Sequence, residues 1–173
     1  SDPRGGVRHV IPNKGNYLTP PDAQNPHEPS LSLSPGHPRS PLWRNISQRV
    51  AAAQELDILA SFIQPSGLDL IQQAIFAALR AKARIRILVG DYLFITSPEA
   101  LARLVGWMQL TSDMPEAGTL EVRLAEISKL SSRPESFHPK AWRIMDSTGG
   151  LWVVGSSNLS KAALETGIEW NVI

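Results

Sequence analysis

The stretch from residue 137 to residue 171, "FHPKAWRIMDSTGGLWVVGSSNLSKAALETGIEWN", decides how the rest of the chain is interpreted. Its runs "FHPKAWRIM" and "LWVVGS" predict two strands, and the turn "DSTGG" between them is typical of a β-hairpin. The run "NLSKAALET" predicts a short helix that ends at Gly167, and "GIEWNVI" predicts a third strand. The segment therefore predicts a hairpin, a short helix and a further strand in that order.

His138 and Lys140 stand one residue apart in the first of these strands. Because alternate side chains of a strand share a face, we expect the imidazole and the ammonium to point the same way. Burying the two groups together is costly unless an anion lies between them. Pro139 donates no backbone hydrogen bond, which favours an edge position for this end of the strand. The pair therefore predicts an anion site.

The second strand runs into "GSSNLS", where Gly155 would let the backbone approach a ligand closely. Ser156, Ser157 and Asn158 offer short polar side chains at the expected start of the helix, and a helix N-terminus favours anions. A plain helix cap is the alternative for these three residues, and a solvated strand residue is the alternative for Glu169. If the hairpin pairs as predicted, the imidazole, the ammonium and the helix start converge at one end of the sheet, an arrangement that suits a phosphate.

Working outward toward the N-terminus, helix and strand patterns alternate. We predict helices over 42–54, 67–82 and 98–110 and strands over 55–63, 83–92 and 119–127. Ser97 followed by Pro98 is typical of a helix start. This order indicates an α/β domain with a mixed β-sheet flanked by helices. Asp91 follows an apolar strand, where α/β proteins often build sites, so it is either a pocket residue or a turn residue.

Composition divides the chain of 173 residues into a tail and one domain. Residues 1–41 hold nine of the fourteen prolines and predict an extended or disordered tail, whereas 42–173 form the domain. The domain has thirteen basic and thirteen acidic residues, so a polyanion would need a local site, a symmetric partner or another domain. The chain has no cysteine and no long apolar run, which excludes thiolate metal sites and a spanning helix and favours a cytoplasmic protein.

Residues 137–171 resemble the signature half-site of the phospholipase D superfamily, which reads HxK, an aspartate shortly after, and then GSxN. The segment "ILVGDYLFITSPEALARL" is similar to phospholipase D-like nuclease domains of restriction enzymes and of the N-termini of DEAD/DEAH-type helicases. The resemblance covers roughly 42–173 and does not extend to the tail. It implies a phospholipase D/nuclease-like fold with one such HKD half-site per chain.

The resemblance also implies an activity, that of a metal-independent phosphodiesterase or endonuclease with a phosphohistidine intermediate and no cofactor. It implies His138 as the nucleophile and Glu169 as the group that orients its imidazole. Lys140 and Asn158, together with Ser156, would hold the phosphate oxygens. Fixed donors aimed at developing charge typically contribute about 3–4 kcal/mol each.

Two features depart from the family pattern. Asp146 comes one residue later than the family aspartate, so it requires a bulge or, alternatively, simply starts the hairpin turn. Only one half-site is present, so either a homodimer brings His138 against its copy or additional domains of a longer chain supply the second half. We expect nucleic acid, DNA rather than RNA, as the partner, and no membrane. The alternatives are a non-catalytic phosphate- or nucleic-acid-binding module of a helicase or restriction system, and a phospholipase.

Overall fold

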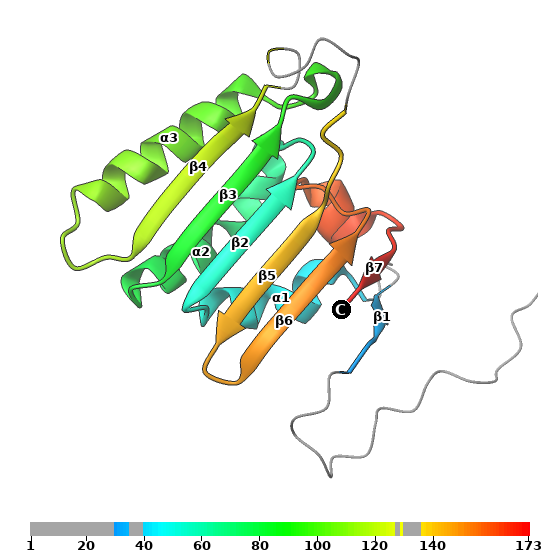
Figure 1. Cartoon of the computed structure of the whole chain (residues 1–173), viewed down its shortest axis with the longest axis horizontal. Helices are drawn as coiled ribbons and strands as arrows, with labels where there is room; N and C mark the ends of the chain where they lie inside the picture. The colour runs from blue at the N-terminus through cyan, green and yellow to red at the C-terminus, as the bar shows by residue number, and fades with distance from the viewer. Residues whose placement is uncertain (1–29, 35–39, 127–128, 130–135) are drawn as a thin grey trace, which may run out of the picture. The chain divides into compact units, whose positions relative to one another are not determined.

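The computed structural model describes residues 30–34, 40–126, 129 and 136–173. These residues contain a seven-stranded mixed sheet with the order β1-β7-β6-β5-β2-β3-β4, against which helices pack (Figure 1). The predicted α/β class with a mixed, helix-flanked sheet is therefore confirmed. The tail prediction for 1–41 falls mostly outside the described residues, and the boundary at residue 41 stays a prediction.

One half of the sheet is parallel. Strands β2, β3 and β4 run side by side, because helices α2 and α3 carry the chain back between them in the way that parallel pairing requires. Ser97 caps α3 as predicted, and its hydroxyl accepts a hydrogen bond from the Ala100 N–H. The bounds are α1 Leu42–Ala51, β2 Glu55–Ala60, α2 Pro65–Arg80, β3 Arg84–Gly90, α3 Pro98–Ser112 and β4 Thr119–Ala125.

The other half of the sheet is antiparallel. The predicted hairpin joins β5 to β6, and β5 also pairs with β2 in the middle of the sheet. Strand β7 pairs with β6 and with β1, a two-residue strand that the sequence did not predict. The carboxyl ends of β2, β3 and β6 therefore meet the amino ends of β5 and β7 at one end of the sheet. The bounds are β1 Leu33–Ser34, β5 Ala141–Asp146, β6 Gly149–Gly155 and β7 Asn171–Val172.

The core lies between one face of the sheet and the three helices; Figure 1 shows α1 and α2 behind the sheet and α3 alongside β4. Ile58 and Ile87 from the strands pack there with Ile46, Ile71 and Leu104 from the helices, all at most 1% exposed. Burying a side chain of this size contributes about 1.5–3 kcal/mol. The core thus fixes the strand ends that carry the site. No helix in the described part of the chain has the length and apolarity needed to cross a bilayer.

The predicted helix start after β6 is wrong. The helical segment is a short π-helical turn, Ala162–Thr166, and it begins four residues after Asn158. The hydroxyl of Ser160 accepts a hydrogen bond from the Ala163 N–H at 3.2 Å, so Ser160 takes the capping position instead. Ser156, Ser157 and Asn158 lie in a loop, and their function cannot be argued from a helix N-terminus.

Candidate active site

His138 and Lys140 lie directly before β5, at the end of the sheet where the strand termini meet. The Nζ atom of Lys140 is 3.0 Å from both ring nitrogens of His138, and it donates to the His138 carbonyl oxygen at 3.1 Å. The Gly155 N–H donates to the Lys140 carbonyl at 3.2 Å and holds the pair beside β6. The structure therefore brings the predicted imidazole and ammonium together.

Ser61 is a member of this cluster that sequence reasoning missed. It is fully buried at the end of β2, where Lys140 Nζ donates to its hydroxyl at 2.9 Å and the hydroxyl donates to the Pro139 carbonyl at 3.3 Å. The contact follows from the antiparallel pairing of β2 with β5, which sets Leu59 opposite Ala141. In the sequence, Ser61 could have been found as a small polar residue at the carboxyl end of an apolar strand, where α/β proteins often build sites.

The Lys140 ammonium is buried, which is unusual for a charged group. This burial lowers its pKa below the ordinary value, while the Glu169 carboxylate raises the pKa in part. Within the described residues its hydrogen bonds go to a hydroxyl, an imidazole and a backbone carbonyl, and no carboxylate forms an ion pair with it. A buried ammonium without a carboxylate partner would gain most from an anionic ligand.

Asn158 reaches the cluster from the loop after β6. It is 7% exposed, and its Oδ1 accepts from the backbone N–H of Ser61 at 3.0 Å and of Phe62 at 3.3 Å. These bonds hold the loops after β2 and β6 together and fix the plane of the amide. The Nδ2 group remains as the donor that a phosphate oxygen could use.

Ser156 and Glu169 pair with each other at the junction of β6 and β7. The Ser156 hydroxyl donates to the Glu169 carboxylate and accepts from the Trp170 N–H at 3.0 Å. No hydrogen bond joins Glu169 to His138 within the described residues, so the predicted orientation of the imidazole by Glu169 stays a prediction. Glu169 nevertheless lies close enough to act on the charge of Lys140.

Two neighbouring residues have structural roles. Ser157 is buried, and its hydroxyl accepts from the Asn171 side-chain amide at 2.9 Å, so it is turned toward β7. At Gly155 a Cβ would lie 2.1 Å from the Trp170 carbonyl oxygen. The close approach expected at Gly155 is therefore made by the β7 backbone and not by a ligand.

The loop after β3 also reaches the cluster. The Tyr92 ring lies against the His138 ring with 4.5 Å between their centroids and 55° between their planes, a contact that the sequence did not predict. Asp91 comes between β3 and this ring, and its carbonyl accepts from the Phe94 N–H at 2.9 Å. The backbone of Asp91 thus forms a turn beside the site.

Asp146 lies at the other end of β5 from His138. Its carboxylate accepts from Arg49 Nε at 2.6 Å and Nη2 at 3.0 Å and from the Thr148 N–H and hydroxyl at 2.8 and 2.6 Å. The Arg49 bond is the main cause that lowers its pKa from 3.8 to about 2. Asp146 therefore starts the hairpin turn, the second of the two roles considered for it, and stands away from the cluster.

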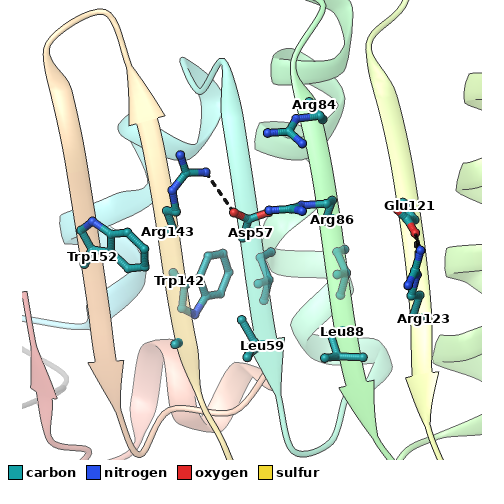
Figure 2. A pocket seen from close by; sticks show the side chains of 13 residues that line it. Asp57, Leu59, Arg84, Arg86, Leu88, Glu121, Arg123, Trp142, Arg143 and Trp152 are labelled. Atoms are coloured by element: carbon teal, nitrogen blue, oxygen red, sulfur yellow. Dashed lines mark hydrogen bonds and ion pairs between the residues drawn. The ribbon is translucent and has the colours of Figure 1, made fainter.

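A hollow of about 570 Å³ lies elsewhere, on the sheet face that the helices leave open. In Figure 2 the side chains of Arg86 and Arg143 both point at Asp57, at 2.6 and 3.0 Å, and Trp152 lies beside Arg143. None of the predicted site residues lines this hollow, and its charges already pair with one another. No cluster of three potential metal-ligating side chains occurs among the described residues.

Comparisons with known proteins agree with this architecture. No protein-family model and no curated protein sequence matches the chain. NucT from Helicobacter pylori is similar in structure, with a TM-score of 0.53 and 19% identity over 83% of this chain and 82% of that one. Phosphatidylserine synthase from Haemophilus influenzae gives a TM-score of 0.56 and 17% identity over 84% of this chain, which spans only 35% of the synthase. Both have the phospholipase D fold, and the fold of this chain is that of a phospholipase D-like domain.

Proposed function

We propose that the chain is a metal-independent phosphodiesterase that cleaves nucleic acid, DNA in preference to RNA, through a phosphohistidine intermediate. The environment of Lys140 carries the proposal. The ammonium is buried, lies 3.0 Å from both ring nitrogens of His138 and forms no ion pair with a carboxylate of the described residues, so it is suited to a phosphate that displaces its present partners. The fold, shared with a nuclease of the phospholipase D superfamily, supports the choice of substrate.

The chemistry begins when a phosphate oxygen accepts the hydrogen bonds of Lys140 and so frees a nitrogen of His138. That nitrogen attacks phosphorus, an N–P bond forms, and the P–O bond to the leaving nucleotide breaks. Lys140 and the Asn158 Nδ2 group donate to the non-bridging oxygens, on which negative charge grows. Water then cleaves the N–P bond and restores the imidazole.

The leaving oxygen needs a proton. One chain supplies only one half-site, whose histidine already acts as the nucleophile. We propose that a second copy of the chain places its own His138 opposite the first, so that one histidine attacks while the other acts as the acid. A two-fold pair would also double the positive charge around the phosphate. This supports a polyanionic substrate despite the net charge of +1.

A nicking assay tests the proposal. Single-stranded circular DNA and, in parallel, supercoiled plasmid are incubated with the wild type and with His138→Ala in EDTA, and the variant's far-UV circular dichroism and melting temperature confirm its fold. We expect nicking by the wild type in EDTA and a loss of at least about a thousandfold in His138→Ala. Equal activity of the two proteins, or activity that depends on Mg²⁺, would refute the mechanism.

The second candidate is a non-catalytic module that binds backbone phosphate in a helicase or restriction system. It is favoured by the hydrogen bond between Ser156 and Glu169, because within the described residues no hydrogen bond joins Glu169 to the His138 imidazole that it would have to orient. This candidate predicts DNA binding that Lys140→Met weakens, with no nicking by the wild type at any protein concentration.

A further inference from the structure

Exposed aromatic side chains stand on both sides of the candidate active site. Phe94, in the loop after β3, is 88% exposed, and Trp170, just before β7, is 63% exposed. In the sheet order β7-β6-β5-β2-β3, His138 at the start of β5 is two strands from each. The two rings therefore belong to segments on opposite sides of β5 in the sheet order, and Tyr92, two residues before Phe94, brings the first of these segments to the His138 ring. Leu93 and Ile95, 69% and 40% exposed, flank Phe94, so this loop presents a contiguous apolar patch, and such patches mark interaction sites.

The loop that carries Phe94 is built at an energetic cost. Leu93 and Phe94 have φ angles of 48° and 58°, the left-handed region that favours glycine, although neither is glycine. The loop is nevertheless held firmly. Thr96 donates to the Gly90 carbonyl at 2.5 Å, and Gln64 donates to the Ile95 carbonyl at 2.6 Å. Strained backbone that its surroundings hold in place is concentrated at ligand-binding sites.

The same loop contacts the candidate active site. Tyr92, two residues before Phe94, packs its ring against the His138 ring at 4.5 Å. On the other side, the Trp170 backbone is fixed by the Ser156 side chain, which also holds Glu169. Both exposed rings therefore belong to segments that contact residues of the candidate site.

We propose that Phe94 and Trp170 are stacking platforms for the unpaired bases on either side of the phosphodiester held at His138. The inference rests on the proposed function and specifies its substrate as single-stranded nucleic acid. Every base has a flat π-face, so two rings bind a strand without regard to its sequence. The bases of a duplex are already stacked and paired, and they could not lie on the rings.

The placement of the rings favours a polymer over a phospholipid. A phosphodiester in a nucleic acid continues as a chain of nucleotides in both directions, which matches one ring on each side. A phospholipid has its acyl chains on one side of the phosphate only, so a lipid site would need a single apolar surface. Loop residues 93–95 resemble such a surface in apolarity, and the experiment therefore includes vesicles.

The test uses a protein that binds without cleaving, His138→Ala, as the parent. Its probes are fluorescein-labelled single-stranded oligo(dT) and an oligomer of the same length built only of abasic residues, with fluorescence anisotropy as the readout. We expect the added Phe94→Ala or Trp170→Ala to raise the Kd for oligo(dT) by roughly tenfold or more. The Kd for the abasic oligomer should change by less than about twofold, because the rings contact bases and not phosphates.

Matched variants separate stacking from damage to the fold. Phe94→Tyr and Trp170→Phe keep a ring and should restore the Kd for oligo(dT), whereas Phe94→Leu keeps apolarity without a ring and should not. Trp152→Ala removes a similarly exposed aromatic residue, 58% exposed, from the open sheet face and should bind like the parent. Melting temperatures confirm that each variant is folded.

Unchanged binding of oligo(dT) in both alanine variants, while the wild type still nicks DNA, would overturn this inference and leave the proposed function standing. Equal losses on both oligomers would also overturn it. Binding of phosphatidylcholine–phosphatidylglycerol vesicles that Phe94→Ala abolishes and Phe94→Leu keeps would assign the loop to a membrane surface instead. If the wild type neither nicks DNA nor binds oligo(dT), the proposed function itself fails.

Discussion

At the scale of single residues, the environment of Lys140 determines the properties of the site. The ammonium is buried, no carboxylate of the described residues forms an ion pair with it, and both ring nitrogens of His138 lie 3.0 Å from it. Desolvation is the main cause of its lowered pKa. An ammonium held in this way loses its proton at a lower pH than an exposed lysine.

This pKa predicts a pH effect. If the ammonium stabilises the charge on phosphate, the rate of phosphodiester cleavage should fall as the pH rises through a value below 10.5, the ordinary pKa of lysine. Lys140→Met should lower kcat by about 10²–10³-fold, as removal of one fixed donor typically does. Lys161→Met, at an exposed lysine of the neighbouring loop, is the control. A pH–rate profile that stays flat up to pH 10.5 would contradict the role.

The sequence revealed His138 and Lys140 but neither Ser61 nor Tyr92. The first two residues belong to one strand, whose alternation alone places them together. Ser61 and Tyr92 follow different strands, and they meet the pair only because β2 pairs with β5 and because the loop after β3 turns toward it. Contacts of this kind depend on the strand order, which the sequence pattern did not contain.

At the scale of elements, the β5–β6 hairpin is fastened to α1 by Asp146 and Arg49. The pKa of Asp146 is lowered from its ordinary value of 3.8, so its negative charge stabilises the fold at pH values above 3.8. This contribution is lost as the pH falls toward 2. The shift corresponds to roughly 2 kcal/mol, and the partial exposure of Arg49 reduces this to about 1 kcal/mol.

Asp146→Asn should therefore lower the free energy of unfolding at pH 7 by about 1 kcal/mol and flatten its pH dependence between pH 4 and 2. Urea unfolding at several pH values measures both effects, and Asp113→Asn, at the exposed end of α3, is the control. The kcat of the variant should equal that of the wild type, because Asp146 lies at the far end of β5. A large fall in kcat with unchanged stability would show that Asp146 acts in the active site.

Two glycines offer a matched pair of substitutions. A Cβ at Gly155 would lie 2.1 Å from the Trp170 carbonyl oxygen, so Gly155→Ala should push β7 from β6, destabilise the protein by about 2 kcal/mol or more and lower activity. At Gly106, in α3, nothing lies within 4 Å of the new Cβ. Gly106→Ala should stabilise by about 0.5–1 kcal/mol. Thermal melting measures both, and equal melting temperatures would show that β7 does not need the close approach.

The elements differ in how far the sequence could predict them. The long helices and the parallel strands have strong periodicity, and their predicted positions agree with α1–α3 and β2–β4 to within a few residues. The short elements do not. β1 contains two residues and depends on pairing with β7, and the helical turn after β6 begins where Ser160, and not the earlier "SSN", caps it.

At the scale of the whole molecule, the single half-site predicts a catalytic unit of two chains. Mixing the wild type with equal amounts of His138→Ala and allowing subunits to exchange leaves about one quarter of the dimers with two histidines. If both histidines are required, the activity per wild-type chain should fall by about half after exchange. Activity that stays proportional to the amount of wild type would mean that each chain works alone.

The central claim is that His138 carries the phosphoryl group during the reaction. The most direct test is to quench wild-type protein rapidly at alkaline pH after mixing it with an oligonucleotide in EDTA, and to digest it for mass spectrometry. We predict a phosphoramidate adduct that maps to His138, is labile in acid and is absent from His138→Ala. Turnover without any adduct at His138, or an equal yield of adduct at another residue in both proteins, would contradict the account.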